Sequence, residues 1–532
     1  MAKQARNWLA VCVAFGCVGM TTVTVTGVVR GAEGDSLQLN MRRRIETSPG
    51  SKRYHAVTEP VAWKPRETAI VVCDMWDDHW CKGAAARVAE MAPRMNEALA
   101  AARKRGVFVI HCPSACMDAY QDTPQRQLAQ QAPVAPARRP LDRWCGLNKE
   151  REGALPIDDS DGGCDCQPRC AHGAPWRRQI ASLSIEPGDA ITDNAEAYYL
   201  IRQRGIKNVI VMGVHANMCV LGRPFSIRQL TYQGLNVVLA RDLTDTMYNS
   251  RARPYASHFT GNDLVVEHIE THWCPTILSG DLIGGRALRY REFRYRDDRR
   301  KHVVIVMAED EYDTQRTLPE FARSHLGKEY RTTLVFGSEK DRNSIPGIEA
   351  LREADVLIVS LRRRTLPKDQ LAVFREYASA GKPIVAIRTA SHGFSPALGG
   401  SVPPGHEAWN EFDREVLGGN YTGHHGNSKP GDPRTLVRVL PEAASHPILR
   451  GVPGDEFVVR SWLYKVLPLA KAATPLMVGR VEGRKPPEPV AWTHTHRGGR
   501  VFYTSLGHPD EFKLPAFQTL LKNAIDWAVA RP

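Results

Sequence analysis

A cysteine and an aspartate each follow an apolar stretch of this chain, where their side chains could do chemistry. Cys219 comes after the apolar run 209–214, at the start of a predicted helix, and Asp74 ends the apolar run 69–73. A helix N-terminus favours a thiolate over a thiol, and its N–H groups can hold an oxyanion. A neighbouring carboxylate can accept the thiol proton. The pair indicates covalent catalysis by a thiol, with a buried core cysteine and a helix-capping aspartate as the structural alternative.

Two strands of one sheet must position this pair. Both runs are short and apolar, and each delivers its polar residue at the carboxyl end. Open α/β sheets hold their sites at that edge. We therefore expect Cys219 and Asp74 to lie close together there.

Three segments, 69–74, 107–111 and 205–220, carry a resemblance to a known family. The last contains the specific run Gly-Val-His-Ala-Asn-Met-Cys-Val, which ends at residue 220. They resemble the isochorismatase-like cysteine hydrolases, the superfamily that includes nicotinamidases, across the segment from Pro65 to Pro275.

The resemblance implies a role for each residue at the two strand ends. Cys219 attacks a carbonyl, and Asp74 takes the thiol proton. A cis peptide bond between Val214 and His215 helps to point the backbone N–H groups of His215 and Cys219 into an oxyanion hole.

One position departs from the family pattern. The family's triad also contains a lysine, which usually follows a strand resembling Asp189–Thr192, and the next residue here is Asp193. Arg177 and Arg178 are candidates to supply the missing positive charge, although a guanidinium cannot shuttle protons as an ammonium does. A working thiol hydrolase and a catalytically degenerate scaffold therefore both stay open.

Other side chains near these segments are expected to shape the pocket or to pair with charges. The expected pocket residues are Trp76, Trp80 and His215. Arg223 could hold an anionic substrate or pair with Asp242 or Asp245, and the structural pairing is favoured. The thiol mechanism requires no dissociable cofactor. A divalent metal beside the site stays open because nicotinamidase relatives contain zinc, but their aspartate and histidine ligand pattern does not transfer here.

Cysteines are concentrated in an insertion rich in Gly, Asp and Pro that also holds Cys145. The dense cluster is Cys164-Asp-Cys166-Gln-Pro-Arg-Cys170-Ala-His172. Its spacing differs from the usual zinc patterns, so disulfides or free loop thiols are favoured over a metal. Elsewhere, Cys112 and Cys116 could bridge each other or stay free.

A second series of strands and helices begins at His302–Ala308. Further short apolar runs follow at 332–336, 354–360 and 383–388, and an amphipathic segment at 369–380 separates the last two. This pattern predicts a parallel sheet with crossover helices.

The end of the chain is similar to the trehalose-utilisation (ThuA-like) family. The similarity rests on Gly498–His508 and the segment 517–528, with further matches at 308–314, 387–393, 446–448 and 490–492. It implies a class I glutamine-amidotransferase-like fold and a role in carbohydrate metabolism. This half of the chain contains no cysteine, which excludes the amidotransferase thiol mechanism for it.

Histidines and carboxylates must therefore carry any chemistry of this second half. The candidates are His508, His392, Glu309 and Glu311. Each follows a predicted strand, so together they could form a metal or general acid/base site if they meet in one pocket. Taken singly, each fits a turn or capping role better.

Length and composition place the chain among multidomain globular proteins. Its 532 residues exceed a single core, and 42% hydrophobic with 24% charged residues exclude wholesale disorder. The formal charge of +13 would permit an acidic partner, but only Arg286–Lys301 stands out, and a solvated linker explains it better. We expect a small-molecule substrate, which could be sugar-related, and no nucleic acid. A homo-oligomer stays open.

The first 32 residues are typical of a targeting sequence. Lys3 and Arg6 precede the apolar run 8–20. This predicts export to the periplasm or the exterior. Because the apolar stretch extends to Val29, a retained membrane anchor is the alternative. We expect no membrane span after it.

These observations predict an α/β protein with two three-layer α/β/α domains and mainly parallel sheets, the second flavodoxin-like. The expected division is a signal peptide or anchor at 1–32, an extended segment at 33–64, an isochorismatase-like domain at 65–283, a basic linker at 284–300 and a ThuA-like domain at 301–532. The predicted function is an exported hydrolase that uses a cysteine on a small amide, ester or related C–N or C–O bond. The alternative is a degenerate isochorismatase-like scaffold joined to a sugar-binding or sugar-processing domain.

Overall fold

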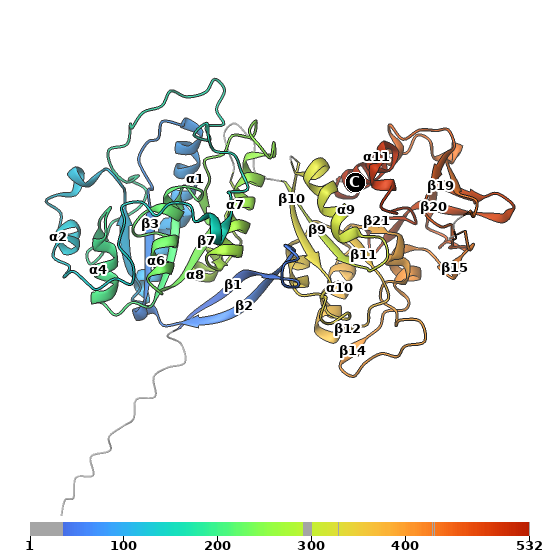
Figure 1. Ribbon diagram of the computed structural model, residues 1–532, viewed down its shortest axis with the longest axis horizontal. Coiled ribbons are helices and arrows are strands. Elements are labelled where there is room, and N and C mark those ends of the chain that lie inside the picture. The colour runs from blue at the N-terminus through green and yellow to red at the C-terminus, as the bar shows by residue number, and fades with distance from the viewer. Residues whose placement is uncertain (1–35, 291–299, 328, 428, 430, 531–532) are drawn as a thin grey trace, which may run out of the picture. The chain divides into compact units, whose positions relative to one another are not determined.

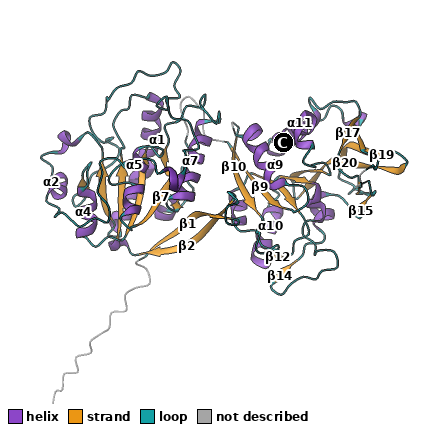
Figure 2. Ribbon diagram, in the orientation of Figure 1, coloured by secondary structure: helices purple, strands orange, loops and turns teal. Residues whose placement is uncertain are grey.

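The computed structural model describes residues 36–290, 300–327, 329–427, 429 and 431–530. Two large sheets organise this part of the chain, one of eight strands and one of nine, and helices flank the strands of each (Figures 1 and 2). The predicted two-domain α/β architecture is confirmed. The predicted leader 1–32 lies outside the described residues, as do residues 291–299 of the predicted linker.

The first sheet has the strand order β2-β1-β8-β7-β6-β3-β4-β5. Its strands are β1 (Leu37–Glu46), β2 (Tyr54–Trp63), β3 (Thr68–Cys73), β4 (Phe108–Cys112), β5 (Ala190–Ile191), β6 (Asn208–Val214), β7 (Asn236–Asp245) and β8 (Thr276–Ile277). The strands from β3 to β8 pair in parallel, whereas β1 and β2 form an antiparallel hairpin at one edge. Two stretches of the segment 33–64, Leu37–Glu46 and Tyr54–Trp63, are thus part of the sheet.

Every residue of β3 and β6 is buried. Successive side chains of a strand point to opposite faces of the sheet, so a sheet covered on both faces needs continuously apolar strands. Ile70 and Val72 accordingly pack in the cluster that contains the buried face of α1, whereas Ala69 and Val71 pack in the cluster on the other face. The apolar runs seen in the sequence are therefore the central strands.

The helices of the first domain are α1 (Lys82–Lys104), α2 (Pro124–Gln130), α3 (Lys149–Glu152), α4 (Glu196–Gln203), α5 (Cys219–Gly222), α6 (Ile227–Tyr232), α7 (His258–His272) and α8 (Gly280–Ile283). The longest is α1, whose buried residues Val88, Met91, Met95 and Leu99 recur every three or four positions. That spacing places them on one helix face, which covers the sheet.

The second sheet has the order β10-β9-β11-β13-β21-β20-β19-β16-β17. Its strands are β9 (Lys301–Ala308), β10 (Tyr330–Phe336), β11 (Val356–Leu361), β13 (Ile384–Ile387), β16 (Thr435–Val439), β17 (Phe457–Val459), β19 (Thr474–Val481), β20 (Arg484–His496) and β21 (Gly499–Thr504). The first five in this order are parallel and the rest antiparallel. Two short pairs lie outside it, β12 (Leu366–Pro367) with β14 (His406–Glu407) and β15 (Gly423–His424) with β18 (Tyr464–Lys465).

Both faces of this sheet are also apolar. Val303 and Ile305 pack with residues of α9 (Thr314–Phe321) and α11 (Pro515–Val529). Val304 and Val306 pack on the opposite side with residues of α10 (Lys368–Ser379). The alternation along β9 thus places one sheet between two helical layers, as predicted for a flavodoxin-like domain.

None of the helices within the described ranges is long and apolar enough to cross a membrane. The first domain's last helix ends at Ile283 and β9 begins at Lys301. The domain boundaries given above stay predictions.

Candidate active site

Asp74 leaves the carboxyl end of β3 in a left-handed backbone conformation with φ of 48°. Non-glycine residues with positive φ are uncommon and concentrate at functional sites. Its N–H donates to the carbonyl oxygen of Cys112 at 3.0 Å, and its Oδ1 accepts the backbone N–H of Ser114 at 2.7 Å. The end of β4 therefore holds a fully buried carboxylate at the sheet edge.

Cys219 reaches the same edge from β6, the neighbour of β3. Gly213 pairs with Cys73 and has φ of 109°, and a Cβ at this position would lie 2.0 Å from the carbonyl oxygen of Cys73. Only glycine fits where the two strands meet. The chain then turns through a cis peptide bond between Val214 and His215, which confirms the bond that the family resemblance implies, and Cys219 begins α5.

Arg223 supplies a cation beside this pair. Its Nε lies 3.3 Å from Asp74 Oδ2, and the Cys219 thiol interacts with both Asp74 and Arg223. Arg223 follows Cys219 by four residues, the spacing that brings two side chains to one face of a helical turn. That spacing was the available signal for this contact.

The predicted pairing of Arg223 with Asp242 or Asp245 is wrong. Asp242 accepts hydrogen bonds from Ser279, and Asp245 pairs with Arg87 at 2.7 Å and with His258 at 2.9 Å.

The thiol and the carboxylate share one buried environment. Burial raises the pKa of the Cys219 thiol, the charge of Asp74 raises it further, and Arg223 opposes both. Burial likewise raises the pKa of Asp74, while Arg223 lowers it. Because α5 spans only four residues, its dipole offsets little of this. Burial and the charge of Asp74 therefore oppose the thiolate that the helix start was expected to favour.

The turn before Cys219 is held by its own backbone. Met218 and Val220 donate their N–H groups to the His215 carbonyl oxygen at 2.9 and 3.2 Å, and Ala216 donates to the carbonyl of Asp245 at 2.7 Å. None of the hydrogen bonds found among the described residues uses the N–H groups of His215 or Cys219. The oxyanion-hole role expected for these two groups stays a prediction.

Aromatic and imidazole rings stand beside the turn. His79 approaches His215 edge-on at a centroid distance of 5.0 Å, and Trp76 stacks on Trp176 at 4.7 Å. The Nε1 of Trp76 donates to the carbonyl oxygen of Ser114 at 3.0 Å, which fixes this ring near Asp74. Burial lowers the pKa of His79 to about 4 and that of His215 well below its usual value, so both imidazoles are neutral at pH 7.

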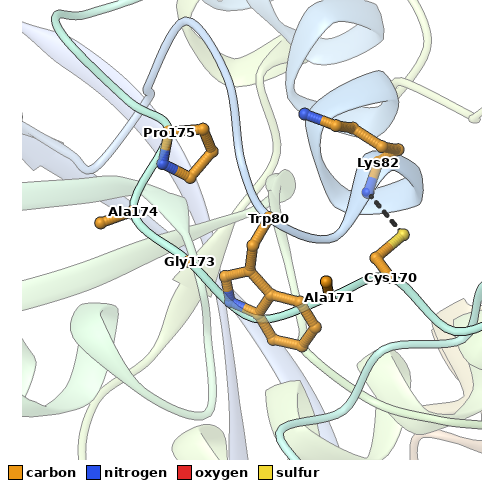
Figure 3. A pocket seen from close by; sticks show the side chains of 7 residues that line it. All are labelled: Trp80, Lys82, Cys170, Ala171, Gly173, Ala174 and Pro175. Carbon is orange, nitrogen blue, oxygen red and sulfur yellow. Dashed lines mark hydrogen bonds between the residues drawn. The ribbon is translucent and has the colours of Figure 1, made fainter.

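A hollow of about 420 Å³ lies on the first domain (Figure 3). Its lining comprises Trp80, Lys82, Cys170, Ala171, Gly173, Ala174 and Pro175. Trp80 stacks on His172 at 4.0 Å beside this hollow, whereas Cys219 and Asp74 do not line it. The roles of Trp76 and Trp80 in holding a substrate of Cys219 stay predictions.

The arginines expected to replace the family lysine have other partners. Arg177 is exposed, and its guanidinium donates to the carbonyl oxygens of Ala174 and Trp176 at 3.2 and 3.1 Å. Arg178 is also exposed, and its N–H lies 3.3 Å from Asp77 Oδ1. The guanidinium that pairs with Asp74 is that of Arg223.

All ten cysteines of the described residues are free thiols, so Cys112 and Cys116 do not bridge each other. Within the described part of the chain, the side chains grouped closely enough to hold a metal ion are those of Cys81, Cys164 and Cys166. The spacing argument missed Cys81 because it lies far upstream of the other two.

In the second domain, side chains following several strands form a ring cluster. Arg388, which follows β13 with φ of 49°, is buried, donates to the Tyr312 hydroxyl at 3.0 Å and lies 4.9 Å from the centre of the Tyr464 ring. The His508 ring lies 6.3 Å from that of Tyr312, and the His392 ring 6.0 Å from that of Tyr464. The structure thus brings His392 and His508 to one cluster and adds an arginine that the sequence argument missed.

The two carboxylates predicted with these histidines are engaged elsewhere. Glu309 is buried, and its oxygens accept the N–H groups of Glu311, Tyr312 and Thr314 at 2.6 to 2.8 Å, which caps α9. Glu311 pairs with Arg362 at 2.9 Å. Glu309 therefore holds the backbone that leads to Tyr312.

Comparisons with known proteins also match different parts of the chain to different kinds of protein. Residues 302–528 match the family model described as ThuA, trehalose utilisation. A ureidoacrylate amidohydrolase of Pseudomonas savastanoi pv. phaseolicola (strain 1448A / Race 6) is 29% identical over 184 residues, which are 31% of this chain and 66% of that protein. The chain therefore spans just under two thirds of the length of that curated relative.

Solved structures resemble each half. A ThuA-like protein of Bacteroides uniformis ATCC 8492 is 20% identical with a TM-score of 0.32, over 43% of this chain and 91% of that one. A cysteine hydrolase of Pseudomonas syringae pv. phaseolicola 1448A is 17% identical with a TM-score of 0.27, over 43% of this chain and 94% of that one. The C-terminal part of the chain is thus similar to the ThuA family and another part to a curated amidohydrolase, which is consistent with a fusion of two domains.

Proposed function

We propose that the first domain hydrolyses a small amide, ester or related C–N or C–O bond with Cys219 as nucleophile. The observation that carries the proposal is the contact of thiol, carboxylate and guanidinium at the carboxyl edge of β3 and β6. The relative named for ureidoacrylate amidohydrolysis supports testing amides first. The leader-like sequence at 1–32 supports an exported enzyme.

In the acylation step, Asp74 takes the proton of Cys219 as sulfur attacks the substrate carbon. The carbonyl oxygen becomes an oxyanion, for which the N–H groups of His215 and Cys219 are the expected donors. The C–N or C–O bond then breaks, the leaving group takes the proton from Asp74, and a thioester stays on the enzyme.

In the second step, water attacks the thioester carbon and gives a proton to Asp74. The acid product leaves, and the sulfur of Cys219 regains its proton. Arg223 keeps a net positive charge beside the site throughout, in the electrostatic role of the family lysine. Because the guanidinium stays protonated, proton transfer rests on Asp74 alone.

The test uses the purified full-length chain and a panel of small amides, ureido acids and activated esters. Turnover is followed by product formation, and the thioester by intact mass after rapid acid quenching. Cys219→Ser should abolish both signals. Cys274→Ser, at a buried thiol remote in sequence, should keep them.

Turnover that survives in Cys219→Ser would place the hydrolysis elsewhere. If the parent chain neither turns over nor acylates with any member of the panel, the degenerate-scaffold alternative replaces the hydrolase.

For the ThuA-like domain, the buried Arg388 among tyrosine rings favours a second function, the binding of a sugar-derived anion. A guanidinium suits a carboxylate, and aromatic rings suit the apolar faces of a sugar. Gluconate, tested by calorimetry on the full chain, should bind the parent and the control Arg375→Met, at an exposed position of α10, but not Arg388→Met. His508→Gln, at a half-buried position, gives a second variant in case Arg388→Met fails to fold. Equal binding by the parent, Arg388→Met and His508→Gln would remove this proposal.

A further inference from the structure

Cys81 and three cysteines of the insertion that lies far downstream of it gather at the start of α1. The Sγ atoms of Cys81, Cys164 and Cys166 all lie within 4.8 Å of one another. The thiol of Cys170 interacts with those of Cys164 and Cys166. Cys81, Cys164 and Cys166 are buried, and Cys170 is half-buried at the edge of the hollow in Figure 3.

The separation of the sulfur atoms fits a tetrahedral thiolate site. Zinc binds thiolates at about 2.3 Å, so two ligands of a regular tetrahedron stand about 3.8 Å apart. Cys81 Sγ and Cys166 Sγ are 3.8 Å apart. A disulfide would instead join its sulfurs at about 2.0 Å and would use the four cysteines only in pairs.

Backbone donors point at these sulfurs. Cys81 is the N-cap residue of the 23-residue helix α1, the end at which the helix dipole favours negative charge. In the first turn, the N–H of Lys82 lies 3.5 Å from Cys170 Sγ, drawn as a dashed line in Figure 3, and the N–H of Gly83 lies 3.2 Å from Cys166 Sγ. Such donors partly neutralise the charge that four thiolates leave on a divalent ion.

The loop that carries the other three cysteines is packed closely against the domain. At Gly163, with φ of 70°, a Cβ would lie 2.3 Å from the carbonyl oxygen of Met247, just after β7. Met247 and Ala84 pack in the same buried cluster as Cys81, Cys164 and Cys166. The loop is thus built into the fold next to the helix start.

We propose that Cys81, Cys164, Cys166 and Cys170 bind one structural zinc ion as four thiolates. No ligand position is left for water, so the site is structural. The ion ties the insertion to the N-terminus of α1. Trp80 and Met218, the residue before Cys219, pack against this cluster, so the ion also supports the wall beside the candidate nucleophile. The site is independent of the hydrolase proposal.

The first measurement is the metal content of the full-length chain, purified without chelator and analysed by mass spectrometry of the elements. We expect one zinc per chain in the parent. Cys164→Ser/Cys166→Ser should bind less than a tenth of that, and Cys274→Ser, at a buried thiol outside the cluster, should keep one zinc.

A second measurement covers the case in which the double variant fails to fold. Cobalt(II) exchanged into the parent should give the strong thiolate-to-metal absorption of a tetrahedral sulfur site, which added zinc removes. Alkylation of the parent after denaturation should label all four cysteines without reductant.

Disulfide-linked peptides among the four cysteines, together with zinc below a tenth of an equivalent, would overturn the proposal. So would one zinc that persists in the double variant, because that ion would be bound elsewhere. Neither result bears on turnover by Cys219, which is measured separately.

Discussion

Replacing Asp74 with asparagine should change the reactivity and the turnover of Cys219 in opposite directions. The side chains have the same shape, and the amide oxygen can still accept the N–H of Ser114, so the change removes mainly a negative charge. That charge raises the pKa of the Cys219 thiol, while Arg223 lowers it. Without Asp74, burial still raises the thiol pKa, and Arg223 still lowers it.

An upper bound on the effect follows from the Coulomb energy of two charges near contact. Unit charges about 4 Å apart interact by about 4 kcal/mol at an effective dielectric constant of about 20. Since one pKa unit is about 1.4 kcal/mol, this is an upper bound of about three units. Partial exposure of the Arg223 side chain, at 27%, reduces it, so we expect the thiol pKa to fall by about 1 to 3 units.

The assay is alkylation by iodoacetamide as a function of pH, with each cysteine quantified by peptide mass spectrometry. At a fixed pH below the pKa, Cys219 of Asp74→Asn should react about 10 to 1,000 times faster than in the parent. Turnover should nevertheless fall about 10² to 10⁴ times, because the base is lost. Buried Cys274 in the same digest is the internal reference, and exposed Asp122→Asn is the matched control.

A Cys219 pKa that stays the same or rises in Asp74→Asn would refute this reasoning. The thiol and the carboxylate would then not share an electrostatic site. Unchanged turnover in the same variant would show that Asp74 is not the base.

Three further variants test other contacts. Arg223→Met should raise the pKa of the neighbouring thiol and lower turnover about 100-fold or more. Arg223→Lys keeps the positive charge, so it should recover part of the turnover and part of the thiol pKa. Equal loss of turnover in the two variants would argue against a role for the charge. Gly213→Ala should lower the free energy of unfolding in urea by about 3 kcal/mol or more, because the added Cβ would overlap a strand carbonyl. The control Gly146→Ala has open space around its Cβ, so its free energy of unfolding should stay within about 0.5 kcal/mol of the parent's. Glu152 is buried, yet hydrogen bonds from a histidine, an arginine and a tryptophan overcome the effect of burial and lower its pKa to about 2. Since the folded pKa is depressed, this contribution of about 3 kcal/mol is present above about pH 4.5 and is lost as the pH falls toward about 2. Glu152→Gln should therefore lose stability at pH 7, and the gap from the parent should narrow below pH 4; a gap that is independent of pH would contradict this.

Much of the fold could be predicted from the sequence because its signals are local. The runs around Ile70, Val211 and Val304 are continuously apolar, and sheets covered on both faces require that. Asp74 stands directly after such a run, and Cys219 follows another after a short turn, so both were recognisable as residues near strand ends. The carboxyl ends of adjacent parallel strands meet, so the proximity of the two followed from the strand order.

The protonation of this pair could not be predicted in the same way. A helix start and a thiol are visible in the sequence, and they led to the expectation of a thiolate. The burial of Cys219 and the proximity of Asp74 raise the thiol pKa, and the short helix α5 offsets little of this rise. Burial and proximity both depend on packing. Desolvation has no local signature.

The sequence by itself determined the two α/β domains, the order of their strands along the chain and the residues that could act as nucleophile and base. Hydrophobic periodicity, turn residues and residue type are local properties of the sequence, and they suffice for those conclusions. The tertiary structure alone decided that Arg223 reaches Asp74, that Arg388 packs against Tyr464, and that Cys81 meets Cys164 and Cys166. These contacts join residues from separate elements, so they depend on how the chain packs and not on any short stretch of it.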